Sequence, residues 1–159
     1  MKSAVGLAAG LALVASVASA DVVAPEDVVY GEYGEIEVSL TGTPGNPEEG
    51  LKVFTGRALG NCVACHSVTA LVDSVAFHGN VGPPLDGVAE RWTEADLRGI
   101  LANAKNVYEG TIMPAFYKTS GFIRPGEGFT SKPATEPLEP MLSAQQIEDV
   151  VAYLMTLKE

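Results

Sequence analysis

Residues 62–66 read Cys62-Val63-Ala64-Cys65-His66: two cysteines three positions apart, with a histidine directly after the second. This spacing is the signature of c-type haem attachment. With two residues between the thiols, one turn of backbone reaches both vinyl groups of a haem, and the next residue falls under the iron. His66 can then ligate the iron through one imidazole nitrogen. The motif therefore predicts one covalently bound haem c.

Half a zinc site and a thioredoxin-like redox pair are the alternative interpretations of the motif. Zinc requires two further Cys or His ligands, whereas the chain has no third cysteine and its one other histidine is His78. A thioredoxin-like pair lies at a helix start after a strand and has no obligatory histidine. His78 falls in the loop at 67–81, where we expect a surface residue rather than an iron ligand.

Residues 1–20 have the pattern of a secretory signal peptide. Lys2 precedes an apolar run at 4–17, and Ala18-Ser19-Ala20 forms a small-residue cleavage site. The run is shorter than the roughly 20 apolar residues of a membrane span. We therefore expect cleavage after Ala20, no membrane span afterwards, and a periplasmic protein. Export agrees with the motif, because haem is attached to c-type cytochromes outside the cytoplasmic membrane.

The exported chain is strongly acidic. Lys2 is one of ten basic residues, so nine remain against 20 acidic residues, a formal charge of −11. Such a charge argues against nucleic acid or an anionic membrane as partner. A partner with a basic face and a merely solvated surface both remain open.

An N-terminal extension at 21–46 precedes the domain expected at 47–159. It has six acidic residues and no basic one, and Ile36, Val38 and Leu40 alternate with polar residues, so a short strand is possible. We expect the extension to be either loose or laid along a partner.

Three helices are predicted from capping residues that precede apolar stripes. The caps are Asn46, Thr93 and Ser143, and the last two have an acidic or amide side chain three residues later. The first helix is expected to end at Gly60 and the third at Leu157.

Two loops carry further candidate site residues. The carbonyl of Pro83 can accept a hydrogen bond from the far nitrogen of His66, which would fix the ring and raise its basicity. Met113 precedes a proline in a loop after a helix, and its soft thioether suits a sixth ligand to haem iron. Met141 and Met155 are weaker candidates, since one lies just before the last helix and the other lies beside its apolar stripe.

Trp92 and the long stretch at 117–140 have roles that the sequence leaves open. Trp92 either stacks on the haem edge or plugs the core. Loops as long as 117–140 are usually functional or disordered. Because Phe122, Ile123 and Phe129 are apolar, we expect this loop to pack on the domain or on a partner.

In its order of motifs the chain resembles class I cytochromes c. The pattern comprises Gly50 with Phe54, the haem motif at 62–66, Gly82-Pro83 with Leu85, then Met113, and Val150 with Tyr153. The resemblance covers about 47–159 and implies an all-α class I cytochrome c fold. It implies that the first and last helices cross, with Gly50 at the close approach and the rings of Phe54 and Tyr153 in contact.

A narrower resemblance is to the SoxX family, the small monohaem subunits of the SoxAX cytochromes of thiosulfate oxidation. It is carried by residues 60–66, 82–87, 91–93 and 113–117, and by the acidic extension and the long loop. It implies that Cys62 and Cys65 hold the haem and that His66 and Met113 are its axial ligands.

The SoxX resemblance implies an electron-transfer subunit without a catalytic site of its own. A larger SoxA-type partner would form a heterodimer with it and carry the catalytic haem, where thiosulfate is joined to a cysteine of the SoxYZ carrier. The electrons would then pass to a small cytochrome c. A free-standing periplasmic carrier is the main alternative, and a haem sensor would require an open sixth position.

Overall fold

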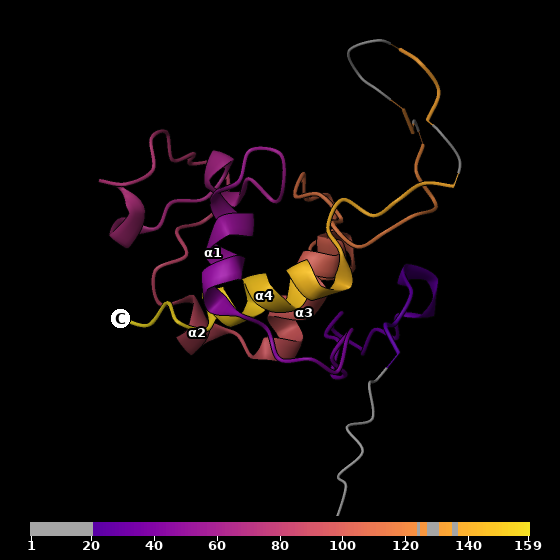
Figure 1. Ribbon diagram of the computed structural model, residues 1–159, viewed down its shortest axis with the longest axis horizontal. Coiled ribbons are helices and arrows are strands. Elements are labelled where there is room, and N and C mark those ends of the chain that lie inside the picture. Colours follow the sequence, from indigo (N-terminus) through magenta and orange to yellow (C-terminus); the bar gives the residue numbers. More distant parts are fainter. Residues whose placement is uncertain (1–20, 124, 127–130, 135–136) are drawn as a thin grey trace, which may run out of the picture.

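The computed structural model describes residues 21–123, 125, 126, 131–134 and 137–159, and within these ranges every regular element is helical (Figure 1). The α-helices are α1 (Pro47–Thr55), α2 (Val88–Arg91), α3 (Glu94–Asn103) and α4 (Ala144–Leu154). Single 3-10 turns are η1 (Pro25–Asp27), η2 (Cys62–Ala64), η3 (Thr69–Leu71) and η4 (Ala104–Asn106). The all-α prediction is confirmed. The expected signal peptide lies outside the described residues, among which no helix is long and apolar enough to span a bilayer.

All three predicted helix starts are confirmed. The side chain of Asn46 accepts hydrogen bonds from the first turn of α1. Thr93 and Asp96 form a reciprocal capping box on α3, and Ser143 and Gln146 form another on α4. These caps satisfy backbone N–H groups that a helix start otherwise leaves unpaired.

The predicted ends of the first and last helices are wrong by a few residues. α1 ends at Thr55 because Gly56 adopts an extended conformation and its N–H bonds back to the Lys52 carbonyl at 2.9 Å. The following turn, closed by a 3.1 Å bond from the Asn61 N–H to the Gly56 carbonyl, leads the chain into the haem motif. α4 ends at Leu154 rather than at Leu157, and the four-residue α2 was not predicted.

The core is built on the crossing of α1 and α4, which Figure 1 shows in purple and yellow. Gly50 lies directly against the backbone carbonyl of Asp149, so no side chain fits at this position. The close approach brings the rings of Phe54 and Tyr153 to a centroid distance of 5.2 Å, at 57° to each other. Such tilted pairs add to the stabilisation from burial alone. The implied helix crossing is therefore confirmed.

Substituting Gly50→Ala is expected to destabilise the haem-loaded protein. Alanine normally favours a helix by about 1 kcal/mol over glycine. Here its Cβ would overlap the Asp149 carbonyl and force the two helices apart, and overpacking costs about 1–3 kcal/mol. Denaturant unfolding measures the change, with Lys52→Ala on the exposed face of α1 as control. A Gly50→Ala protein at least as stable as wild type would contradict the packing argument.

The N-terminal extension packs on its own domain, which differs from the expectation of a loose or partner-bound segment. The Ile36 N–H donates to the Ala95 carbonyl of α3 at 3.0 Å, and the Val23 N–H donates to the Leu40 carbonyl at 2.8 Å. Ile36 and Leu40 are buried but Val38 is 70% exposed. The segment therefore lacks the two-residue alternation of the strand that the sequence allowed.

A buried ion pair fastens the extension to α3 and α4. Arg98 Nε lies 2.9 Å from Glu148 Oε1 and Arg98 Nη2 lies 3.1 Å from Oε2, a two-point contact between side chains that are 6% and 5% exposed. Arg98 Nη1 donates to the Ile36 carbonyl at 2.7 Å, and Glu148 Oε1 accepts from the Leu40 N–H at 2.7 Å. Each charged group thus holds one end of the segment 36–40.

Candidate haem site

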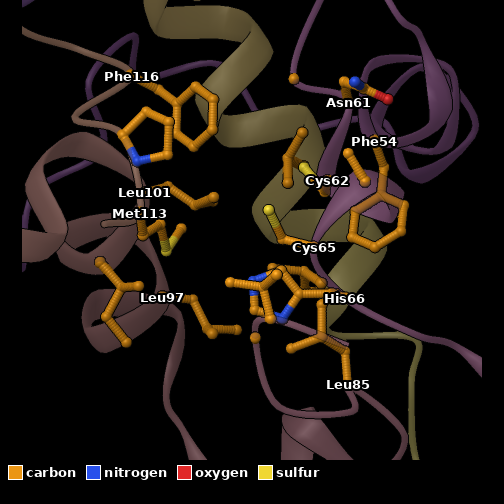
Figure 2. Close-up of a pocket in the computed structure, with 18 of the residues that line it drawn as sticks. Phe54, Asn61, Cys62, Cys65, His66, Leu85, Leu97, Leu101, Met113 and Phe116 are labelled. Atoms are coloured by element: carbon orange, nitrogen blue, oxygen red, sulfur yellow. The ribbon is translucent and has the colours of Figure 1, made fainter. Parts of the chain in front are cut away.

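A cavity of about 690 Å³ opens between α3, α4 and the loops that carry the predicted site residues (Figure 2). Its size lies within the range typical of cofactor pockets, about 300–1,000 Å³. Its lining is mainly apolar, with side chains from α3 and α4 such as Leu97, Leu101 and Val150. All five predicted site residues line it: Cys62, Cys65, His66, Pro83 and Met113.

The haem motif forms one wall of the cavity. Asn61 adopts a left-handed conformation, φ 46°, which asparagine tolerates better than most residues. It starts the tight turn η2, in which the N–H groups of Cys65 and His66 both bond to the Cys62 carbonyl, at 3.1 and 2.9 Å. In Figure 2 the sulfur atoms of Cys62 and Cys65 lie on the same side of the cavity as the His66 ring. The turn thus places two thiols and one imidazole where one flat macrocycle can meet all three.

Burial keeps the Cys62 thiol neutral. Desolvation raises the pKa of Cys62 from 9.0 to about 12, because a thiolate is poorly solvated among apolar groups. A neutral, buried thiol is a poor nucleophile.

Backbone atoms of Gly82 and Pro83 hold the His66 ring in place. Its Nδ1 lies 2.8 Å from the Pro83 carbonyl oxygen, the contact expected from the sequence. Because a carbonyl only accepts, Nδ1 carries the proton and Nε2 is left with a free lone pair. Gly82 lies against the other side of the ring: a Cβ there would come within 2.6 Å of Nδ1 and 2.7 Å of Nε2. The Gly82-Pro83 pair therefore fixes the ring and leaves one nitrogen available for a metal.

Substituting Gly82→Ala is expected to displace the His66 ring. The added methyl group overlaps the imidazole, and a steric change of this kind destabilises by about 1–3 kcal/mol. The absorption spectrum of the haem-loaded protein reports the displacement, and thermal unfolding reports the loss of stability. Pro84→Ala, at an exposed position that keeps its carbonyl, is the matched control. If Gly82→Ala matched the control in both measurements, the Gly82-Pro83 pair would not determine the position of the His66 ring.

Met113 lies on the opposite wall. Figure 2 shows its sulfur pointing into the cavity, across from Cys65 and His66. Two contacts hold the loop: the Met113 N–H lies 3.2 Å from Thr111 Oγ1, and Lys105 Nζ donates to the Met113 carbonyl. The thioether and the imidazole therefore face each other across the cavity, where both would be able to ligate an iron held between them.

The other methionines are placed less suitably. Met141 also lines the cavity but is 57% exposed at its rim. Met155 is partly buried against the core and is not a lining residue. The residues present therefore fit a haem, with Met113 as the best-placed thioether.

The structure also gives the positions of Trp92 and His78. Trp92 lines the cavity and also contacts the core, with its ring edge-on to Tyr108 at 6.4 Å and 89°. His78 is partly buried away from the cavity, and its Nδ1 accepts a 3.4 Å bond from the Val68 N–H. Sequence reasoning missed Tyr108 and Ile100 as lining residues. Ile100 lies in the apolar stripe of the helix expected after Thr93, where a core position is the default, and nothing in the sequence singled out Tyr108.

Comparison with known proteins extends these observations. The family profile described as cytochrome c matches residues 47–158. The chain is similar to a chain in the crystal structure of SoxXA from P. pantotrophus, with 64% sequence identity, a TM-score of 0.81, and coverage of 86% of this chain and 98% of that one. The search of curated proteins gave no match.

Proposed function

The chain belongs to the cytochrome c family and carries one covalently attached haem c, and from this premise we propose that it is the electron-transfer subunit of a SoxXA-type thiosulfate-oxidising complex. The observation that carries the proposal is the 64% identity to a SoxXA chain of which 98% is covered. When bound, the haem supplies a one-electron redox centre.

In this proposal each site residue has one role. Cys62 and Cys65 would anchor the haem by thioether bonds, and His66 and Met113 would ligate its iron. Pro83 orients His66 through the 2.8 Å hydrogen bond to Nδ1, which raises the basicity of the ligating nitrogen. The apolar lining excludes water, and a thioether ligand favours the reduced state, so both features suit an electron acceptor.

The chain receives electrons rather than performing the chemistry. A SoxA-type larger cytochrome subunit joins thiosulfate oxidatively to a cysteine of the SoxYZ carrier, and a small cytochrome c takes the electrons onward. Support comes from the side chains themselves. Both thiols line the haem cavity, the His66 Nδ1 is bonded to backbone, and His78 lies away from the cavity. Both thiols and the His66 ring would thus be engaged by the haem, and His78 lies outside the cavity where a substrate of the haem would have to bind.

The proposed location is the periplasm, after removal of residues 1–20. The pattern of Lys2, the apolar run and Ala18-Ser19-Ala20 supports export. Residues 47–159 form the cytochrome domain in this proposal, with 21–46 as its N-terminal extension.

The test is purification of the exported protein from its host through a C-terminal tag, followed by a haem stain of a denaturing gel. We expect a stained band at the mass of residues 21–159 and a second, larger stained band. Thiosulfate with the SoxYZ carrier should then reduce the haem of this chain only when the larger subunit is present. A single stained band, with no such dependence, would reject the complex and favour a free-standing carrier.

Substituting Met113→Gly is expected to change the oxidised spectrum and lower the reduction potential, because a soft thioether stabilises ferrous iron. Axial ligands tune haem potentials over roughly 0.8 V, so the shift should be large enough for a simple redox titration. Met141→Gly, at the exposed rim of the same cavity, is the matched control. An unchanged oxidised spectrum in Met113→Gly would remove Met113 as ligand and favour a sensor with an open sixth position.

A further inference from the structure

The loop that carries Met113 is attached to α3 just after the methionine. The N–H groups of Phe116 and Tyr117 donate to two carbonyl groups in the last turn of α3, at 3.2 and 3.1 Å. Two residues separate Met113 from this attachment, and the first of them, Pro114, has a fixed φ angle. Because so little chain lies between, a movement of Met113 out of the cavity is expected to pull on the attached segment.

Tyr117 connects this loop to the N-terminal extension. It is 4% exposed, and its hydroxyl group donates to the Val23 carbonyl at 2.6 Å. Phe116 lines the haem cavity, whereas Tyr117 is not a lining residue. Burial raises the pKa of Tyr117, and the nearby Glu26 carboxylate raises it further. The hydroxyl group therefore stays protonated at neutral pH and remains a hydrogen-bond donor.

The acceptor of this bond is itself held in place. The Val23 N–H donates to the Leu40 carbonyl at 2.8 Å, and the Leu40 N–H donates to Glu148 Oε1 at 2.7 Å. Glu148 is in turn paired with Arg98. A continuous series of hydrogen bonds thus runs from the buried ion pair through the extension to Tyr117.

Beyond Tyr117 the chain leaves the domain, as Figure 1 shows in orange. The sequence predicted that the loop at 117–140 packs on the domain or on a partner. Phe122 is 43% exposed and Ile123 is 97% exposed, so Ile123 does not pack on the domain, and Phe129 lies outside the described residues. Tyr117 therefore ends the buried segment through which the extension can act on Met113.

We propose that the N-terminal extension braces the loop of the sixth ligand, and that Tyr117 is the positioning residue that connects the two. The hydrogen bond from Tyr117 to Val23 is made while Met113 lies in the cavity. It therefore favours this position of the loop over one in which the sulfur has moved away. The inference rests on the proposed function, since it assumes that Met113 ligates the iron, and it gives the extension control over access to the sixth position.

The test uses imidazole as a competitor of Met113 in the oxidised, haem-loaded chain. Imidazole binding is followed by the absorption spectrum, and its apparent affinity depends on the fraction of molecules in which the sixth position is open. Tyr117→Phe removes the hydroxyl group and keeps the ring, so the variant should fold and, without imidazole, have the wild-type spectrum. We expect it to bind imidazole about three- to tenfold more tightly than wild type, the effect of one hydrogen bond.

Two variants are the matched controls. Tyr33→Phe makes the same chemical change in the extension, at a tyrosine that is 75% exposed. Asn46→Ala removes the cap of α1, which should lower the unfolding midpoint about as much as the loss of one hydrogen bond, at a residue that does not line the cavity. Both controls should bind imidazole like wild type.

The possible outcomes separate the inference from the proposed function. Equal imidazole affinities in Tyr117→Phe and Tyr33→Phe would overturn the brace and leave the proposed function standing. If Asn46→Ala raised the affinity as much as Tyr117→Phe, the affinity would follow overall stability, and the inference would also be wrong. Met113→Gly is the reference for an open sixth position. If it bound imidazole no more tightly than wild type, the ligand role of Met113 would fail, and the inference with it.

Discussion

A chain in which Cys62 and Cys65 are both replaced by alanine should lose its haem completely on a denaturing gel. The two thiols lie on one wall of the cavity, in a turn fixed by hydrogen bonds to the Cys62 carbonyl. The chain has no other cysteine, so no second position can form a thioether. Haem staining and the intact mass of the exported protein measure the result. Staining that persisted in the double variant would contradict attachment through this motif.

The single variants separate attachment from ligation. Cys62→Ala or Cys65→Ala alone leaves one thioether, so we expect a stained band of reduced intensity. His66→Ala leaves both thioethers but removes the proximal ligand, so staining should persist while the spectrum changes. His78→Ala is the matched control, because this second histidine lies outside the cavity. A spectrum altered equally by both histidine variants would contradict the assignment of His66.

The features that could be predicted from the sequence are those determined by neighbouring residues. Caps at Asn46, Thr93 and Ser143 are local, because each satisfies N–H groups two or three residues away. The helix ends at Thr55 and Leu154 were missed by a few residues. Apolar residues continue beyond both ends, and the chain turns where its backbone finds other partners.

The position of the extension could not be predicted because it depends on residues far away in the sequence. The backbone groups of Ile36 and Leu40 bond to side chains 62 and 108 positions later. Arg98 and Glu148 each lie next to an apolar stripe on their helix, where a charged residue normally reads as solvent-exposed. Only the crossing of α3 and α4 shows that the two charges meet.

The candidate site likewise combines features that local sequence determines with features that depend on residues far away in the sequence. The haem motif and the Pro83 carbonyl were predicted because the chemistry fixes their spacing. Met113 was favoured from its loop and the proline after it, and the structure adds that its sulfur faces His66 across the cavity. Tyr108 was missed as a lining residue because its place depends on how the loop after α3 closes over the cavity.

Breaking the Arg98–Glu148 pair should cause the largest loss of stability. In Arg98→Met the Glu148 carboxylate stays buried, and among the described residues the Leu40 N–H remains as its hydrogen-bond donor, while the Ile36 carbonyl loses its donor. Removing one partner of a buried ion pair costs about 3–5 kcal/mol. Denaturant unfolding of the haem-loaded protein measures the change. The exposed pair Lys52–Glu49, at 2.6 Å on α1, is the control, and Lys52→Met should leave the unfolding midpoint almost unchanged.

The double variant Arg98→Met with Glu148→Met distinguishes the ion pair from simple loss of packing. If the cost of Arg98→Met comes from an uncompensated buried charge, removing that charge as well should restore part of the stability. Both backbone ends of 36–40 would still lose their anchors, so the segment 21–45 should become a protease-sensitive site in single and double variants alike. The haem spectrum should stay the same, because neither charged residue lines the haem cavity. Additive losses of stability in the double variant would show that Arg98 and Glu148 stabilise the fold independently. If 21–45 resisted protease in these variants, the extension would be held by its apolar contacts rather than by this ion pair.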